Sequence, residues 1–454
     1  MTYRILSLLL LLLLCSCGNE KEANKLSYSA SGRVIDDSGS AIEGVKIAYT
    51  PTEFVLSNSQ GNWVITEFTS PATLTPSLEN YTFSPASLQL TDSSNNVLFT
   101  GTQDQSENQI AMQIFNWFNQ QQLANGLLES VENGNVVSLY DNALAAIVYM
   151  MNNDFTKAEN IFDFFDSRIE TELNAGFGGF SQLRDRNGSP NNHRWMGDNA
   201  WLLIALNNYK SLTGKNTYDY LASQITDWLM SLQDADGGLF AGYGANNKLL
   251  NYKVTEGNID AFNAIEGYTD FHSQVLHFLK NQRWDSNDKN LVAWPENPPY
   301  LYALDLHPWS YLIFNNYPSS ALTTADRFLT TQTAINGEQI SGYCFDEDQD
   351  TVWLEGTGQM ALAFALAGMQ NQKQLYLSEI EKALIESTNY PDGAGFPYAT
   401  NPGTVYGADS LWATADTSIA ISSGAWYLFA KNNYNPFQVG REKMIPQADI
   451  FWLN

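Results

Sequence analysis

The stretch Thr351–Leu362 reads TVWLEGTGQMAL and sets an acid, Glu355, just before a run of small apolar residues. Acids are favoured at helix starts, both as caps and by the helix dipole. Six short polar signatures of this kind precede apolar runs, and their marker residues are Asp141, Asp198, Glu256, Asp305, Glu355 and Ser422. The intervals of 57, 58, 49, 50 and 67 residues each hold one apolar and one amphipathic segment. This spacing predicts a helical hairpin repeated six times.

Such hairpins cannot bury their apolar faces alone and must stack on their neighbours. Six of them can close into a ring, with the apolar helices inside and the amphipathic helices outside. We therefore expect residues 111–454 to form a mainly α-helical (α/α)6 toroid. Every inner helix would then begin at the same end of the ring, and the five carboxylate markers would face one mouth.

Residues 28–102 show a different pattern, with period-two alternation and frequent turn residues. Roughly seven short strands predict a small β-sandwich, and the pattern resembles the carboxypeptidase-regulatory-like or immunoglobulin-like modules of secreted bacterial proteins. The segment holds no cluster of ionisable groups, so a spacer or accessory role is favoured. Residues 103–110 are interpreted as a linker.

The N-terminus carries a targeting segment. Arg4 precedes an apolar run that is too short to span a membrane, and small residues follow it. Residues 14–17 read LCSC and resemble a bacterial lipobox, which would make Cys17 the lipidated start of the mature protein, with residues 18–27 as a tether. An ordinary signal peptide over residues 1–17 is the alternative. We expect an exported lipoprotein anchored to a bacterial membrane, at the outer membrane or cell surface. With two cysteines in this segment, Cys344 stands alone, which excludes a disulfide framework.

Charge excludes one class of partner. The chain of 454 residues carries 49 Asp and Glu against 23 Lys and Arg, a formal net charge of -26. A nucleic-acid partner would require a basic surface. The 44% content of hydrophobic residues is enough for a sizeable core.

Two of the acidic markers differ from the others. Glu256 and Glu355 are each followed by Gly, which weakens a helix unless a close approach is needed. Capping or loop-tying remains an alternative for Asp141 and Asp198, and Asp305 could hold a loop. Tryptophans neighbour the signatures, where they could stack on sugar rings or pack in the core; they are Trp195, Trp201, Trp309, Trp353, Trp412 and Trp426.

The six hairpins, the step TEGNID at 255–260 and the step WLEGTGQMA at 353–361 resemble the six-hairpin glycosidase superfamily over residues 109–437. The resemblance implies a carbohydrate-active enzyme, commonly an inverting hydrolase with a Glu acid and an Asp or Glu base. It makes Glu256 and Glu355 the leading catalytic candidates, followed by Asp260 and Asp198. Asp260 lies four residues after Glu256 and so shares its helix face. The expected partner is an oligo- or polysaccharide, bound by Asp141, Asn199, Trp195, Trp201, His193, Arg194, Asp305, His307, Trp309, Trp353 and Gln359.

Cofactor motifs are weak. Asp346, Asp348 and Asp350 alternate as in calcium loops, but the expected Gly and Glu positions hold Thr351 and Thr357. A solvated acidic loop is favoured and calcium is the alternative. The four histidines, at positions 193, 272, 277 and 307, lack the spacing of a zinc site. No metal or other cofactor is therefore expected.

Three other functions compete with hydrolysis. A polysaccharide lyase on the same ring would require converging Arg, His and Tyr side chains, and the only candidates near the signatures are His193, Arg194 and His307. The Gly-rich turns at 175–180 and 234–240 resemble those of terpene cyclases, but no Asp-rich diphosphate motif accompanies them. A non-catalytic glycan-binding or scaffold lipoprotein is the third alternative.

Overall fold

The chain forms two compact units, Met1–Asn108 and Gln109–Asn454, in a computed structural model. The structure describes residues 27–78, 81–103, 105–297, 300–403 and 416–453. The predicted signal peptide, Cys17 and Trp412 lie outside these residues. Within the described ranges, no helix combines the length and apolar character needed to cross a membrane.

The first unit is a β-sandwich of two four-stranded sheets, with strand orders β4-β1-β8-β6 and β3-β2-β5-β7. Strand β1 pairs with β4 antiparallel and with β8 parallel. The alternating pattern of the sequence places Val34, Trp63 and Phe99 in the core between the sheets. The strands are β1 (Ser27–Asp36), β2 (Lys46–Ala48), β3 (Phe54–Leu56), β4 (Asn62–Thr69), β5 (Ala72–Ser77), β6 (Tyr81–Ser84), β7 (Leu88–Leu90) and β8 (Ser94–Gln103).

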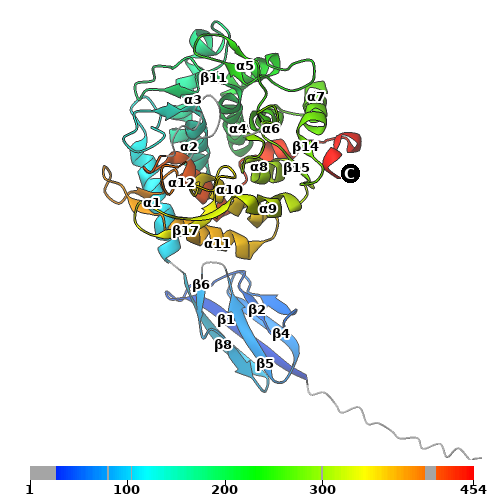
Figure 1. The fold of residues 1–454 in the computed structure, drawn as a ribbon. Helices are drawn as coiled ribbons and strands as arrows, with labels where there is room; N and C mark the ends of the chain where they lie inside the picture. Colours follow the sequence, from blue (N-terminus) through cyan, green and yellow to red (C-terminus); the bar gives the residue numbers. More distant parts are fainter. Residues whose placement is uncertain (1–26, 79–80, 104, 298–299, 404–415, 454) are drawn as a thin grey trace, which may run out of the picture. The chain divides into compact units, whose positions relative to one another are not determined.

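In the described part of the second unit, inner helices form a ring (Figure 1), and there are six of them. Each inner helix packs on the next, and the last packs on the first. The ring confirms the (α/α)6 toroid predicted from the signature spacing. The inner helices are α2 (Leu139–Met151), α4 (Met196–Thr213), α6 (Thr255–Ala264), α8 (Leu306–Ile313), α10 (Leu354–Leu366) and α12 (Ile421–Asn432).

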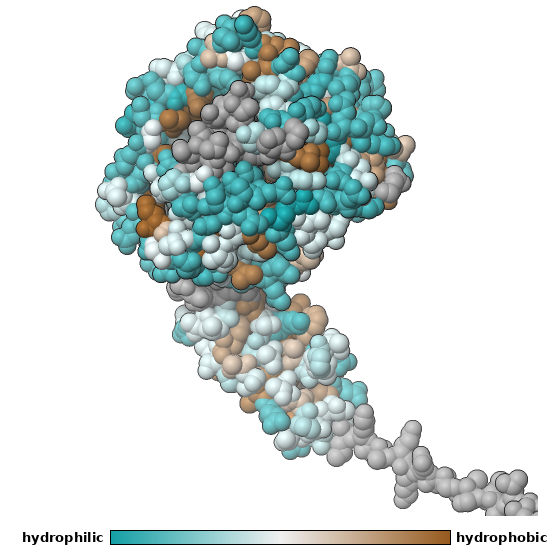
Figure 2. Space-filling model, viewed as in Figure 1, coloured by the Kyte–Doolittle hydropathy of each residue, from teal (hydrophilic) through white to brown (hydrophobic). Residues whose placement is uncertain are grey.

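An outer layer of helices surrounds the ring (Figure 1). Its members are amphipathic, with one buried face each; in α5, for example, Leu221, Ile225 and Leu229 are buried. Figure 2 shows that the view it gives of this unit is largely hydrophilic. The outer helices are α1 (Gln105–Gln121), α3 (Phe155–Asp166), α5 (Asp219–Ser231), α7 (Asp270–Phe278), α9 (Ser320–Thr324) and α11 (Gln370–Glu381).

Helix α1 closes the ring. It begins at Gln105, inside the segment interpreted as a linker, and it packs on the last inner helix, α12. Gly424 of α12 leaves room for Ile114 and Phe118 of α1. The loop that follows α1 also joins the start of α12, where the Ile421 N–H donates to the Ser130 carbonyl at 2.9 Å. The sixth hairpin is therefore made from the two ends of the unit.

The connections between helices differ at the two ends of the ring. Inner helices pass to outer helices through short turns, such as residues 152–154 and 367–369. Outer helices return to inner helices through long connections, so these lie with the N-termini of the inner helices and form the mouth. They carry short strands: β9 (Val137–Ser138), β10 (Leu183–Arg184), β11 (Arg194–Trp195), β12 (Gly242–Tyr243), β13 (Leu249–Leu250), β14 (Trp284–Asp285), β15 (Asn290–Leu291), β16 (Leu329–Thr333), β17 (Gln339–Tyr343), β18 (Ile385–Glu386) and β19 (Ala394–Gly395).

An aromatic cluster fills the centre of the ring. The Trp201 ring centroid lies 5.4 Å from that of Trp309 and 5.9 Å from that of Trp426. Phe437, which precedes the short helix α13 (Gln438–Arg441), adds its ring 4.9 Å from Trp201. These rings are at most 2% exposed. These four side chains fill the centre of the helical toroid below the mouth.

Candidate active site

Six carboxyl groups gather where the inner helices begin, and we call them the acidic cluster. Asp141, Asp198, Asp260, Asp305 and Glu355 are between 0% and 8% exposed, whereas Glu256 is half-buried. The negative charges of Asp305, Asp198 and Glu355 add to burial in raising the pKa of Glu256. Glu256 and Glu355 therefore lie at the same end of the ring.

Glu355 is held through one of its two oxygens. The Tyr140 hydroxyl donates to Glu355 Oε1 at 2.5 Å, and the Gln359 amide donates to the same oxygen at 3.2 Å. The Trp426 indole N–H in turn donates to the Tyr140 oxygen at 2.8 Å. No described residue makes a hydrogen bond of ordinary geometry with Glu355 Oε2. Burial raises the pKa of Glu355 to about 8, although the Tyr140 bond opposes the rise.

Asp198 is linked to a histidine through Gln182. The Gln182 amide donates to Asp198 Oδ2 at 3.4 Å, and the Gln182 Oε1 lies 2.9 Å from His193 Nδ1. The His193 ring stacks on Trp195 at 5.9 Å. Burial raises the pKa of Asp198 to about 7.

The remaining acids of the cluster have different surroundings. Asp305 caps α8, since its Oδ1 accepts the Leu306 N–H at 2.8 Å, and burial raises its pKa to about 7. Asp141 does not cap α2, because Ser138 takes that place, and burial raises its pKa to about 7 also. Asp260 is fully buried, and no described residue makes a hydrogen bond of ordinary geometry with either of its oxygens.

The asparagines of the signatures tie loops to the inner helices. Asn199 Oδ1 accepts the Phe180 N–H at 2.9 Å, and its amide donates to the carbonyls of Phe180 and Trp195. Asn142 and Asn258 bind Leu128 and Leu239 in the same way. The hydrogen-bonding capacity of Asn199, predicted to bind substrate, is thus used within the protein.

The glycines after Glu256 and Glu355 have a packing reason. A Cβ on Gly257 would meet the Met196 side chain at 2.6 Å, and one on Gly356 would meet the Trp353 ring at 2.2 Å. The close approach that these glycines predict is therefore a contact with side chains of the same protein and not with a substrate. They give no evidence for the role of the neighbouring acids.

Several predicted binding side chains pack against, or form hydrogen bonds with, other groups of the protein. Trp201 and Trp309 belong to the central aromatic cluster. His307 turns toward the outer layer, where its Nδ1 lies 2.7 Å from the Ala321 carbonyl oxygen. Trp353 precedes α10 and packs on Phe345 at 4.8 Å. The Arg194 guanidinium donates to the Asn192 carbonyl and to Asn247.

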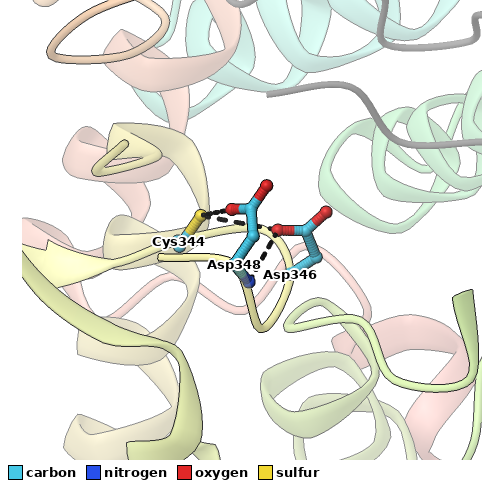
Figure 3. Close-up of side chains that lie close together, drawn as sticks. All are labelled: Cys344, Asp346 and Asp348. Carbon is cyan, nitrogen blue, oxygen red and sulfur yellow. Dashed lines mark hydrogen bonds between the residues drawn. The ribbon is translucent and has the colours of Figure 1, made fainter. Parts of the chain in front are cut away.

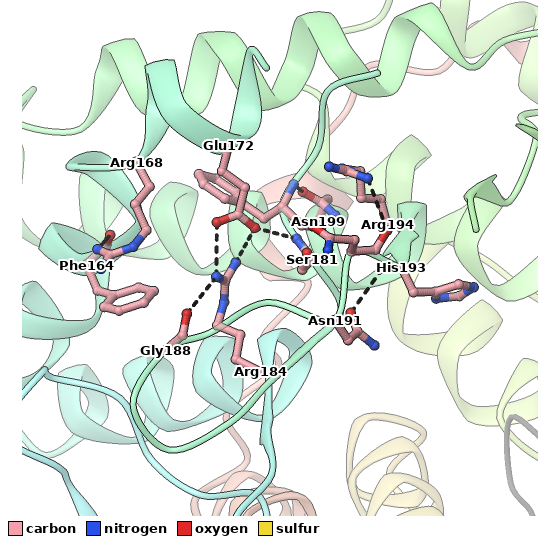
Figure 4. A network of polar contacts seen from close by, with 12 residues as sticks. Phe164, Arg168, Glu172, Ser181, Arg184, Gly188, Asn191, His193, Arg194 and Asn199 are labelled. Atoms are coloured by element: carbon pink, nitrogen blue, oxygen red, sulfur yellow. Dashed lines mark hydrogen bonds and ion pairs between the residues drawn. The ribbon is translucent and has the colours of Figure 1, made fainter. Parts of the chain in front are cut away.

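A buried ion pair holds the loop that carries His193 and Arg194 (Figure 4). The Arg184 guanidinium binds Glu172 at 2.5 Å and 3.0 Å, and Glu172 also accepts the Ser181 N–H at 2.7 Å. Bidentate pairs of this kind fix geometry as well as charge. The loop is therefore built to hold its side chains in place at the mouth.

Two site residues were not among the sequence candidates. Tyr140 contacts Glu355 directly and stands beside the marker Asp141, so its place in the first signature is the signal for it. The charges of Glu355, Asp141 and Glu256 add to burial in raising the pKa of the Tyr398 hydroxyl, which indicates that Tyr398 lies beside the cluster. It follows no signature, and no pattern in the sequence marks it.

A second acidic group lies in the loop after β17. Cys344 Sγ is 3.8 Å from Asp346 Oδ1 and 3.7 Å from Asp348 Oδ1 (Figure 3). Among the described residues, this is the one group of three or more such side chains close enough to hold a metal. Burial raises the pKa of Cys344 to about 11, and a thiolate is a soft ligand that suits zinc or copper better than calcium. Oxygen ligands alone would suit calcium, so the donor set fits that ion only in part.

Comparisons with known proteins agree with the ring. No protein-family model matches the chain, and no curated protein matches it. A glycosidase solved as a glutamate-to-alanine variant has a TM-score of 0.52 at 12% identity, covering 73% of this chain and 99% of that one. A D-mannose isomerase gives 0.51 at 13% identity, covering 72% and 97%. The cellobiose 2-epimerase of Bacillus thermoamylovorans B4167 gives 0.50 at 10% identity, covering 72% and 98%. These likenesses confirm the (α/α)6 fold.

Proposed function

We propose that this protein is a carbohydrate-active enzyme that hydrolyses glycosidic bonds at the acidic cluster. The observation that supports this most is the setting of Glu355. Its Oε1 is fixed by Tyr140 and Gln359, which leaves Oε2 as the oxygen that can carry a transferable proton. A carboxyl that keeps its proton at neutral pH suits the general acid of glycoside hydrolysis.

Glu256 is the proposed base. Coupled carboxyl groups lose protons as a group, and the first charge settles where water solvates it best. Glu256 is the most exposed member of the acidic cluster, and water reaches it most easily. Its carboxylate would activate the attacking water while Glu355 protonates the leaving oxygen. We expect inversion at the anomeric carbon, with Asp260 and Asp198 as supporting acids.

A sugar isomerase or epimerase is the second candidate. His193, linked through Gln182 to Asp198, could act as a base toward a carbon-bound proton. Two solved proteins with this fold are an isomerase and an epimerase. His193 is joined to the acidic cluster through Gln182, whereas Glu355 and Glu256 are members of the cluster, so we favour hydrolysis. A polysaccharide lyase and a non-catalytic glycan-binding protein are the third and fourth candidates.

A product assay separates these functions. The wild-type protein and the Glu256→Gln, Glu355→Gln and His193→Gln variants are incubated with a panel of glycans, and products are identified by mass and by NMR of the anomeric proton. Hydrolysis adds one water to the substrate mass, and either Glu variant should lower the rate by about 1,000-fold. An unchanged mass with a changed sugar, lost in His193→Gln, would establish isomerisation. A product with an unsaturated uronate would establish a lyase. Glycan binding without any product would favour the non-catalytic glycan-binding protein.

We also propose that the chain is a lipoprotein anchored through Cys17, with the β-sandwich as a spacer. A covalent lipid on Cys17 would hold the enzyme at a membrane surface without a spanning helix. Expression in a bacterial host, with the wild-type chain beside Cys17→Ser, tests this. Wild-type protein should sediment with membranes and the variant should not, whereas equal partition would contradict the anchor.

A further inference from the structure

The acidic cluster has no basic partner among the described residues. Burial and like charges surround its six acids, and none of the ion pairs observed in the described ranges includes any of them. Residues 404–415, which the structure does not describe, contain no Lys, Arg or His either. Buried acids are ordinarily paired with a cation or fully hydrogen-bonded. Without such a partner these acids take up protons, as their raised pKa values indicate, whereas a positively charged ligand would keep them ionised and paired.

In the described ranges, several buried acceptor atoms at the cluster lack a hydrogen bond of ordinary geometry, and beside them the Trp201 indole N–H, which lowers the pKa of Asp260, lacks one too. Both oxygens of Asp260, Oε2 of Glu355 and Oε1 of Gln359 make no hydrogen bond of ordinary geometry with the described residues. Gln359 is fully buried and cannot lose its polarity by protonation, so its free oxygen needs a donor. A ligand that brings several N–H donors and a positive charge would satisfy both needs at once.

We infer that the substrate carries a protonated primary amine, as deacetylated amino sugars do, and that Glu256, Asp198 and Asp305 receive it with Asp260 beneath them. The inference rests on the proposed function for its catalytic meaning. An ammonium group supplies three hydrogen-bond donors and a positive charge, whereas a neutral sugar donates hydrogen bonds from its hydroxyls but carries no charge. A uronate or a sulfated sugar would be repelled by each of these acids that is ionised.

A bare metal ion fits the cluster less well. The one group of side chains that comes close enough to share a metal, within the part of the chain that the structure describes, is the Cys344 loop. The acids of the mouth stand too far apart for that. A ligand with the dimensions of a sugar can reach acids on several helices.

Binding of matched monosaccharides tests the inference without turnover. Calorimetry compares glucosamine, N-acetylglucosamine, glucose and glucuronate at one ionic strength and at a pH below the pKa of the sugar amine. Glucosamine should bind the wild-type protein at least about tenfold more tightly than glucose, because hydrogen bonds to charged groups are the stronger ones. N-acetylglucosamine should resemble glucose, and glucuronate should bind most weakly.

Two substitutions locate the effect. Asp260→Asn and Asp305→Asn keep the side-chain shape and remove one charge each, and each should reduce the advantage of glucosamine to about threefold or less. Asp227→Asn, on the exposed face of α5, changes the net charge equally and should leave the advantage intact. Circular dichroism confirms that each variant is folded.

The outcomes for the two proposals are distinct. Equal binding of glucose and glucosamine, no binding of glucosamine, or an advantage unchanged in both Asp variants would overturn the inference. Hydrolysis of neutral glycans could still stand in those cases. Amine-selective binding without turnover of any glycan would overturn hydrolysis and leave the inference in place.

Discussion

Glu132 and Asp260 are both buried acids of the helical unit, and their surroundings are opposite. Glu132 accepts hydrogen bonds from the Trp117 indole at 2.7 Å, from Ser387 at 2.6 Å and from the backbone and hydroxyl of Thr388 at 3.0 Å and 2.8 Å. Burial raises its pKa, but these bonds outweigh burial and the pKa lies below the ordinary value. Asp260 has no hydrogen bond of ordinary geometry with the described residues; the Trp201 side chain lowers its pKa, but burial with the charges of Glu256 and Asp305 raises the pKa well above the ordinary value.

The contrast separates structure from function better than burial does. Glu132 ties the loop before α2 to the loop before α12, and both of its carboxylate oxygens accept hydrogen bonds. Asp260 ties no described loops together in this way. Acids kept buried at a net cost in stability are expected where a ligand or a reaction needs them.

The pH dependence of stability should show the largest effect. The pKa of Asp198 is 3.8 in an unfolded chain and about 7 in the ring, which corresponds to roughly 4 kcal/mol for this one group. The folded protein then holds a proton that the unfolded chain has lost, so stability is greatest at low pH and falls as pH rises through about 7. We expect the melting temperature to be lower at pH 8 than at pH 5. Asp198→Asn should flatten that slope, and a melting temperature that rises over this range would contradict the account.

Glu132→Gln should give the next largest effect. The amide loses the charge that strengthens four hydrogen bonds and sets an N–H against neighbouring donors, so we expect a loss of about 3 kcal/mol in unfolding free energy. Activity per folded molecule should stay near that of the wild type. Chemical denaturation beside a turnover assay measures both quantities. A loss of activity without a loss of stability would give Glu132 a role like the one proposed for Glu256 and Glu355.

Tyr140→Phe should remove one of the hydrogen bonds that Glu355 accepts, and so increase its difference from the fully hydrogen-bonded Glu132. Removing the donor at Glu355 Oε1 raises the pKa of this acid further, so the alkaline limb of the rate profile, set near pH 8, should move to higher pH. The rate at the optimum should fall by about tenfold, since the carboxyl is then less well oriented. The pH profile of kcat/KM gives the readout. A limb that stays in place would remove Glu355 from the role of acid.

Asp260→Asn should have the smallest effect on stability and the opposite sign to Glu132→Gln. An amide avoids the burial of an unpaired charge, so a gain of about 1 kcal/mol is expected at neutral pH. The gain should vanish at pH 4, where the aspartate is itself protonated in the folded protein. Thermal melts at the two pH values test this. A loss of stability at neutral pH would mean that a partner satisfies Asp260.

The spacing of the signatures was enough to predict the ring and the end of it where Glu256 and Glu355 would meet. It succeeded because an acid near five of the six inner helix starts is a local signal that the ring repeats. The tryptophans could not be assigned in the same way. Trp201 and Trp309 lie near their markers in sequence, but one turn of helix carries them from the mouth to the central cluster.

Other features depend on contacts between distant residues. Tyr140 reaches Glu355 across 215 positions, and Glu132 reaches Thr388 across 256. The glycines of the signatures predicted close approach correctly, but the approaching groups, Met196 and Trp353, could be identified only in three dimensions. Tyr398 carries no local signal at all.

The pairing of α1 with α12 has a consequence for biosynthesis. The outer partner of the last inner helix is the first helix of the unit, so the ring stays open until Ile421–Asn432 has been made. Until then the acids of the mouth remain in contact with water and titrate as ordinary carboxylates. Loop closure of this length is slow, because contacts far apart in sequence must form together. Taking up protons should therefore accompany the final step of folding, and the closed ring should form more favourably at low pH than at high pH.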